Sequence, residues 1–337
     1  MAYSSNPVAL WKGAPVTLQN SAGRVNFSVI TQDNGAVVYT GRAVSRPGAA
    51  AVVTDIADIA ADYCRQTPIP IPSFFLDQTY DRGTAFPGIF NRRFVVQVSG
   101  TTVTSINVDC IADWSYRYAT PSRAGFLSDP VLNLVSPDQV LVFSHHYAPA
   151  TSVALKQGGT TLESITGLTA SRPYNYAFPL ARHAVGGMDI QVTSGSAAAA
   201  YKVLACPADV LYYVNAFGGW DSLVVAPMVK VSQEITRQAV TMDPDLAAYD
   251  ERNRRDFLIE TGQLFQVSTP WLTDTESDKF SLHIPGSPLL FLQHDGTVYP
   301  VTVEDTQLQA FITQYTNGRR PVRYTINLRL AAYRFRK

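Results

Sequence analysis

The sequence predicts a mainly β protein of two to three antiparallel β-sandwich-like modules with one short helix. Runs of about five to eight residues alternate polar and apolar side chains, which is the period of half-buried strands. Turn-forming pairs such as Ser99-Gly100, Gly158-Gly159 and Asp295-Gly296 separate many of these runs. Helical periodicity is scarce, so the strands define the fold class.

The strand pattern recurs from the N-terminal to the C-terminal part of the chain. Pro300 lies inside one run and favours an edge strand or a bulge there, because proline cannot donate to a ladder. The last run alternates cleanly and is expected to bury Tyr324, Ile326, Leu328 and Leu330 in a sheet. The clearest runs are residues 25–29, 94–98, 103–108, 139–143, 188–192, 297–303 and 323–330.

The short helix is predicted over residues 55–63, with Thr54 as its N-cap and acidic residues near its start. Its apolar residues fall on one face at helical spacing. A second helix over residues 304–311 is an alternative to a strand or loop there. The residues that share the apolar face of the first helix are Ile56, Ile59, Ala60 and Tyr63.

The runs group into three modules. Residues 1–124 form a β-rich N-terminal module that contains the short helix. Residues 125–207 carry compact strands spaced as in an immunoglobulin- or fibronectin-like β-sandwich. Residues 208–337 form a β-rich C-terminal module.

Composition favours an assembly component over a nucleic-acid or membrane protein. The 337 residues carry 27 Lys+Arg and 27 Asp+Glu, so no net charge attracts a nucleic acid or an anionic membrane. Only 16% of the residues are charged, and low self-repulsion favours association. No apolar run approaches the roughly 20 residues that span a bilayer, and no signal peptide is visible. Cys64, Cys110 and Cys206 are isolated and are expected to be buried thiols.

No motif predicts an enzyme, a cofactor or a metal site. The nucleophile-elbow, zinc-protease, phosphate-loop and dinucleotide fingerprints are all missing. His145 and His146 are adjacent, so a regular strand directs them to opposite faces. The acidic run Asp274 to Asp278 has three alternative interpretations, which are a solvated loop, a cation site, or a glycosidase pair of Asp274 and Glu276. The basic clusters near residues 252–255, 319–323 and 334–337 suit salt bridges between subunits, with nucleic-acid contact as the lesser alternative.

The segment Tyr212 to Ser222 is the most distinctive in the chain. It carries an aromatic strand pattern that ends at Gly218-Gly219 and resumes with Trp220-Asp221. Two glycines allow a turn with positive φ, and Phe217 and Trp220 are large enough to anchor that turn on a core. The sequence therefore predicts Phe217, Gly218, Gly219, Trp220 and Asp221 as structural or assembly residues that set a bend between the second and third modules.

Together with Asp113-Trp114-Ser115-Tyr116 and Leu127-Ser128-Asp129-Pro130-Val131, this segment resembles virion structural proteins of tailed phages and prophages of Bacteroidetes. The resemblance implies a non-enzymatic tail, tail-hub or head-to-tail connector component. Such a protein would assemble in the host cytoplasm into the virion, and its partners would be copies of itself and neighbouring virion proteins. A glycan-binding, adhesin-like module is the alternative, and it requires exposed aromatic side chains on one face. A glycan hydrolase is a third hypothesis.

Overall fold

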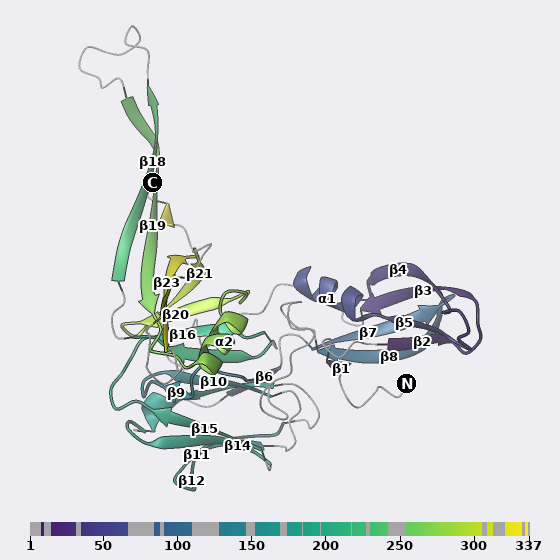
Figure 1. Ribbon diagram of the computed structural model, residues 1–337, viewed down its shortest axis with the longest axis horizontal. Coiled ribbons are helices and arrows are strands. Elements are labelled where there is room, and N and C mark those ends of the chain that lie inside the picture. The colour runs from purple at the N-terminus through teal and green to yellow at the C-terminus, as the bar shows by residue number, and fades with distance from the viewer. Residues whose placement is uncertain are drawn as a thin grey trace. The chain divides into compact units, whose positions relative to one another are not determined.

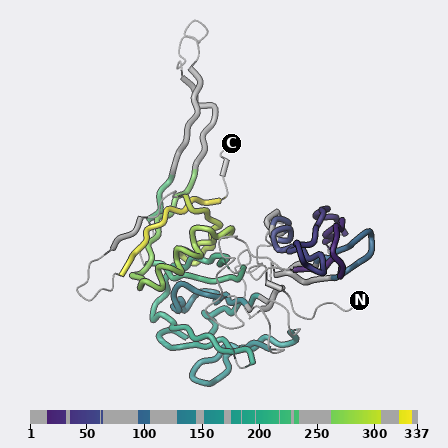
Figure 2. Tube along the Cα trace, turned by 45° about the vertical axis from the view of Figure 1, so that its right-hand side comes forward, coloured from purple at the N-terminus to yellow at the C-terminus, as the bar shows by residue number. Residues whose placement is uncertain are grey.

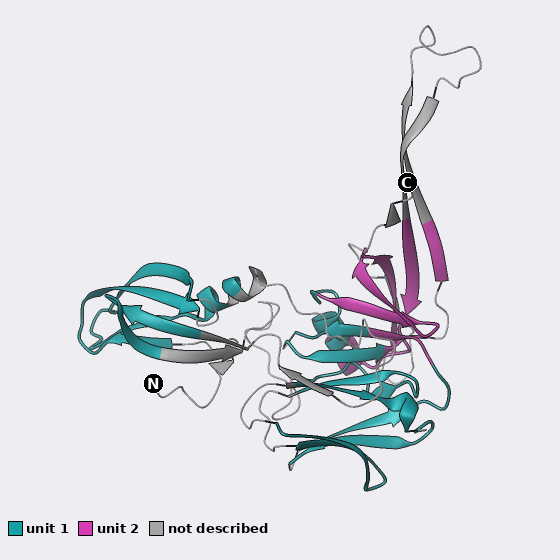
Figure 3. Cartoon of the chain, turned by 180° about the vertical axis from the view of Figure 1, so that it is seen from behind, with its two compact units in different colours: residues 1–207, 212–223, 279–288 teal, residues 208–211, 224–278, 289–337 magenta. Residues whose placement is uncertain are grey.

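The structure is a computed structural model and is mainly β, as the sequence predicts. The chain forms two compact units, shown in Figure 3. Unit 1 comprises residues 1–207, 212–223 and 279–288, and unit 2 comprises residues 208–211, 224–278 and 289–337. Unit 2 thus coincides with the predicted third module except for two segments that belong to unit 1. The described residues are 8–9, 15–31, 35–66, 84–87, 91–109, 128–145, 152–168, 174–183, 185–195, 197–216, 218–226, 230–241, 254–304, 309–312, 321–331 and 334–335.

The N-terminal part of unit 1 is built on a five-stranded sheet in the order β1-β8-β7-β3-β4, beside the two-stranded pair β2-β5. Phe27, Val29, Phe94 and Val96 are buried on β3 and β7, because alternate residues of each strand face the core. The strands are β1 (Val8–Ala9), β2 (Pro15–Gln19), β3 (Arg24–Thr31), β4 (Val37–Val44), β5 (Val52–Asp55), β7 (Asn91–Val98) and β8 (Thr101–Asp109).

The predicted short helix is present as α1 (Ala57–Gln66). Its predicted cap is wrong, because Thr54 belongs to β5, where it pairs with Val16. Asp55 takes that role instead, since its carboxylate accepts the Ala57 N–H at 2.9 Å. Ile56 and Ala60 are fully buried.

A β-sandwich is present and consists of two sheets, ordered β10-β13-β6 and β12-β11-β14-β15-β9. Figure 1 shows β6 and β10 in one layer and β11, β14 and β15 in the other, and Figure 2 follows the same layers along the chain trace. Buried apolar side chains from both sheets, including Phe143, Leu155, Phe178 and Val192, form one core cluster. The strands are β6 (Thr84–Pro87), β9 (Leu134–Val135), β10 (Val140–His145), β11 (Ser152–Gln157), β12 (Thr160–Thr166), β13 (Tyr174–Pro179), β14 (Asp189–Ser194) and β15 (Ala197–Val203). Because β6 lies at residues 84–87, the sandwich includes a strand from before residue 125.

Three predicted hairpin turns are confirmed. Ser99-Gly100 joins β7 to β8 with φ of 49° and 78°, and Gly158-Gly159 joins β11 to β12 with φ of 53° and 85°. Asp295-Gly296 has φ of 49° and 74°. Positive φ at both central residues matches the right-handed twist of the flanking strands, so glycine, asparagine or aspartate is favoured at these positions.

Unit 2 contains a sheet with strands in the order β20-β21-β23-β19-β18, to which β22 and β24 add short pairings. Ile326 and Leu328 on β23 are fully buried as predicted, whereas Tyr324 and Leu330 are half-buried. Pro300 pairs with Phe291, and the ladder between β21 and β23 begins only at Val301. The strands are β18 (Lys230–Thr241), β19 (Arg254–Ser268), β20 (Leu290–His294), β21 (Thr297–Val303), β22 (Gln309–Ile312), β23 (Val322–Leu330) and β24 (Arg334–Phe335). Residues 309–312 are therefore a strand, not the end of the alternative helix at 304–311.

A second helix, α2 (Asp274–His283), replaces the predicted acidic loop. The Glu276 carboxylate accepts the Thr273 N–H at 2.7 Å and the Thr273 hydroxyl at 2.9 Å, while the Glu276 N–H faces the Thr273 hydroxyl at 3.4 Å. This reciprocal arrangement is a capping box, and acids in the first turn suit the helix dipole. The acids thus start a helix, and Glu276 is a helix cap rather than half of a carboxylate pair.

None of the described helices is long and apolar enough to cross a bilayer. Cys206 is exposed, so its predicted burial is wrong. Cys110 lies outside the described residues, as does the side chain of Cys64.

Candidate functional site

The glycine pair predicted as a bend forms the turn of a tight hairpin between β16 (Val210–Val214) and β17 (Trp220–Val224). Asn215 donates its backbone N–H to the Gly219 carbonyl at 2.7 Å, and the Gly218 N–H reaches the Asn215 carbonyl at 3.0 Å. Gly218 has a φ of 81°, which favours glycine. Phe217 lies outside the described residues. Because residues 212–223 belong to unit 1, the turn closes a hairpin inside that unit, where the sequence predicted a bend between two modules.

The side chains of Asn215 and Asp221 hold the turn in place by hydrogen bonds. The Asn215 Nδ2 donates to Asp221 Oδ2 at 2.6 Å, and its Oδ1 accepts the Gly219 N–H at 3.0 Å. The Asp129 N–H donates to the same Asp221 oxygen at 2.9 Å. All three side chains are buried, so each bond is made away from competing water.

The start of β17 is held by two buried serines. The Trp220 N–H donates to Ser144 Oγ at 2.7 Å, and the Ser128 hydroxyl donates to the Trp220 carbonyl at 3.3 Å. Ser128 Oγ also accepts the Ser144 N–H at 2.6 Å. Trp220 is fully buried, as its predicted anchoring role requires.

The two tyrosines of β16 add further bonds. Tyr212 Oη accepts the Val140 N–H at 3.2 Å, and Tyr213 Oη accepts the Val131 N–H at 3.3 Å. Burial raises the pKa of both phenols above the ordinary value, so both stay neutral. The hairpin is therefore joined to residues 128–144 through side-chain to backbone bonds on both of its strands.

His283, at the end of α2, reaches the same cluster. Its Nδ1 lies 3.3 Å from the Ala216 backbone nitrogen, which can only donate. Nδ1 therefore accepts from Ala216, and the Nε2–H donates to Asp129 Oδ2 at 3.3 Å. Lys279 Nζ donates to Asp129 Oδ1 at 2.6 Å. Asp129 thus accepts from a buried imidazole and from an ammonium group on the same helix.

Asp221 makes the stability of this cluster depend on pH. Burial, the largest cause, raises the Asp221 pKa from 3.8 to about 6. The folded protein keeps this proton to higher pH than the unfolded chain. The stabilisation of the folded state by protonated Asp221 is therefore fully present below the unfolded pKa and is lost as pH rises through about 6. The Asp221 contribution to the unfolding free energy of the parent protein should fall by about 3 kcal/mol between roughly pH 4 and pH 7. We expect this fall to be absent in Asp221→Asn.

Urea unfolding of the parent protein and Asp221→Asn across that pH range measures this effect. The difference between the two proteins cancels the titration of the other groups. Stability curves that run parallel at all pH values would contradict the assignment.

The other described histidines also pair with carboxylates. His183 Nε2 lies 3.0 Å from Glu163 Oε2, and His294 Nδ1 lies 3.0 Å from Asp209 Oδ2. Within the described ranges no three His, Cys, Asp or Glu side chains gather as metal ligands. His146, the His145 side chain and most of the basic clusters lie outside what the structure describes.

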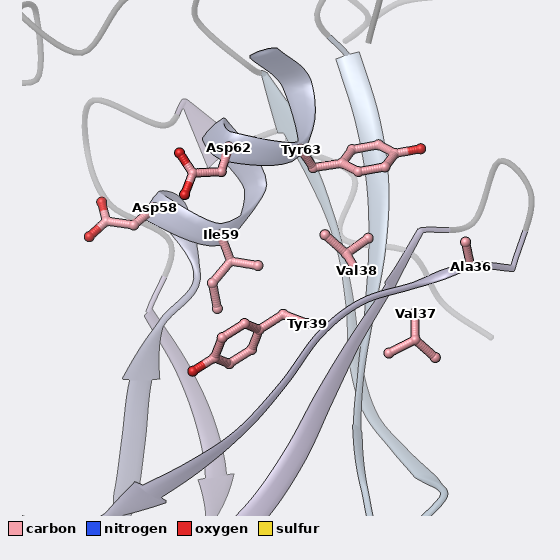
Figure 4. Close-up of a pocket in the computed structure, with 8 residues that line it drawn as sticks. All are labelled: Ala36, Val37, Val38, Tyr39, Asp58, Ile59, Asp62 and Tyr63. Atoms are coloured by element: carbon pink, nitrogen blue, oxygen red, sulfur yellow. The ribbon is translucent and has the colours of Figure 1, made fainter. Parts of the chain in front are cut away.

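The N-terminal sheet carries a pocket of about 480 Å³ that the sequence did not indicate. It lies between the start of β4 and α1, and Figure 4 shows the rings of Tyr39 and Tyr63 with Ile59 and Val38 nearby. Asp58 and Asp62 also line it, from the same helix. The sequence feature that could have indicated this pocket is the spacing of Asp58 and Asp62, which lie one helical turn apart on α1. They lie opposite the strand that exposes Tyr39.

No protein-family model and no curated protein matches the chain. Three solved structures are similar over much of it at low identity. The I9–I11 tandem from titin is 6% identical, over 93% of this chain and 85% of that one, with a TM-score of 0.18. The Bacteroides ovatus protein SGBP-B in complex with a mixed-linkage heptasaccharide is 11% identical, over 80% and 60%, with a TM-score of 0.15. Domains 4–9 of the surface layer protein SbsC are 9% identical, over 94% and 43%, with a TM-score of 0.18.

The fold and the site define a class of protein. The chain is a mainly β protein with a sandwich whose edge is fastened to a tight hairpin by buried polar groups. The hairpin cluster is buried, so its contacts serve the fold, whereas the pocket beside α1 is open to solvent.

Proposed function

We propose that this protein is a non-catalytic structural component of a phage virion, in the tail, the tail hub or the head-to-tail connector. It assembles with copies of itself and with neighbouring virion proteins. The observation that supports this proposal best is the hairpin of β18 and β19 in unit 2. These two strands pair with each other over more residues than either pairs with any other described strand.

Pairing between β18 and β19 runs from Lys230 opposite Gln266 to Thr241 opposite Arg254. The strand β23 pairs with β19 only at residues 264–268, and β24 pairs with it only at 260–261. Among the described strands, the rest of the hairpin has no third strand beside it. This ribbon covers residues 237–241 and 254–259, and six residues at ~3.4 Å each give it a length of about 20 Å.

A two-stranded ribbon is marginally stable in water, and a strand edge with unsatisfied backbone groups tends to pair with another chain. The strand β18 ends the sheet order of unit 2, and its residues 230–233 are exposed. An arm of this kind gains its stability when a neighbouring subunit packs on it or adds a strand to it. Repeated around a ring, such contacts join subunits through strand edges without a dedicated pocket.

The proposal is tested with a variant in which this ribbon is removed. Residues 237–259 are replaced by Asn-Gly, which joins Thr236 to Glu260 through a two-residue hairpin turn. We expect the full-length protein to form discrete oligomers, alone or with the products of its neighbouring genes, in analytical ultracentrifugation and electron microscopy. The shortened variant should keep its melting temperature and stay monomeric.

A Gly-Ser insertion at the turn Gly158-Gly159 is the matched control, because it changes another hairpin and should assemble normally. The proposal is wrong if the full-length protein stays monomeric with all its genomic neighbours. It is also wrong if the shortened variant assembles as well as the parent.

A glycan-binding module is the second candidate function. The pocket beside α1 favours it, because an exposed tyrosine and two carboxylates lie around one depression.

A further inference from the structure

We propose that the pocket between β4 and α1 binds a neutral saccharide. This is a ligand site in addition to the assembly role, and it deepens the second candidate function. Its volume of about 480 Å³ falls within the range of pockets that hold small ligands. The ligand chemistry follows from the two tyrosines, the two aspartates and the apolar floor.

The ring of Tyr39 is held in a fixed place on β4. A Cβ at Gly41 would lie 2.3 Å from that ring, so the ring occupies the space that the glycine leaves open. On its inner side the ring contacts buried Phe27, with the ring centroids 5.7 Å apart. Tyr39 is nevertheless 42% exposed, so part of its ring surface is open to a ligand.

Tyr63 is placed in a similar way from α1. Its ring meets Phe94 edge-on, with the centroids 5.8 Å apart and the planes at 85°. Phe94 is fully buried, so both tyrosines stand on the core of the N-terminal sheet. Rings that are already fixed lose little conformational entropy when a ligand binds.

The charged groups of the pocket are two carboxylates, which accept hydrogen bonds. Asp58 and Asp62 are four residues apart on α1, which places them on one face of the helix. Both are exposed, and an ionised carboxylate offers only acceptors. No lysine, arginine or histidine is among the eight described residues that line the pocket.

A saccharide matches this arrangement. One face of a sugar ring is made of C–H groups, which can pack on an aromatic ring and on Val38 and Ile59. The hydroxyl groups at its rim can donate to the two carboxylates. A cationic ligand fits less well, because salt screens exposed carboxylates and the open pocket does not remove water from the charge.

The experiment uses the full-length protein on a glycan array of neutral bacterial surface oligosaccharides, with oligolysine as the cationic probe. Isothermal titration with the strongest array saccharide then compares variants. Tyr39→Ala, Asp62→Asn and Gly41→Ala should each raise the dissociation constant about tenfold. In Gly41→Ala the added methyl displaces the Tyr39 ring, whose atoms are the nearest to it, and thermal unfolding reports how much of the packing on Phe27 is lost.

Val44→Ala is the matched control, since Val44 is 55% exposed on the same strand and does not line the pocket. The proposal fails if the array is blank, if Val44→Ala weakens binding as much as Gly41→Ala does, or if oligolysine binds and the saccharides do not. Gly41→Ala should still assemble like the parent, so failure of this site and failure of the assembly role give different results.

Discussion

Replacing Asp129 with alanine is expected to lower the free energy of unfolding by about 3 kcal/mol at neutral pH. The carboxylate is only 6% exposed and accepts from Lys279 and His283. Its removal leaves the His283 Nε2–H buried without this acceptor, and it leaves the Lys279 ammonium group without this counter-ion. A buried donor left without its acceptor costs more than the bond itself contributes.

Urea unfolding followed by tryptophan fluorescence measures this loss. Asp278→Ala is the matched control, because Asp278 is an exposed acid on α2. Lys279→Met should cost only about 1 kcal/mol, since the lysine side chain is 25% exposed and solvent screens its pair. Equal losses in Asp129→Ala and Lys279→Met would contradict the central role of the buried imidazole.

Asn215→Ala is expected to cost about 3 kcal/mol. The change removes the bond to Asp221 and leaves the Gly219 N–H without its side-chain acceptor. The turn also requires positive φ at Gly218, which the asparagine amide helps to hold. The same unfolding experiment checks this value.

Asn133→Ala is the control, since Asn133 is an exposed asparagine of the same unit. We expect it to change stability by less than about 0.5 kcal/mol. If Asn215→Ala were as mild, the turn would be held by its backbone bonds alone.

Local features of the sequence were sufficient to predict the fold class, several strands and three hairpin turns, but not the long strands β18 and β19. Ser99-Gly100 and Asp295-Gly296 carry residues that tolerate positive φ, and the hairpins follow from that requirement. The helix α2 was missed because its signal is a cap rather than an apolar face. Thr273 and Glu276 have the spacing of a capping box, but the acids around them match a solvated loop equally well.

The polar cluster could not be predicted from the sequence for a different reason. Asp129 and His283 are 154 positions apart, and Ser144 and Trp220 are 76 apart. Hydropathy patterns describe neighbours along the chain, so they do not indicate which buried polar groups meet. The sequence singled out Trp220 and Asp221, but it did not indicate Asn215, Ser128, Ser144 or His283 as their partners.

The distance along the chain between these partners bears on the order of folding during synthesis. The strands of the sandwich are complete by Val203, yet Asp129 and Ser144 find their partners only in residues 215–221 and 279–283. Parts of unit 2 are made before those last residues emerge, because unit 2 includes residues 224–278. A sandwich that has just left the ribosome therefore has polar groups still awaiting their partners, and unit 1 cannot reach its final stability before residues 279–288 are made.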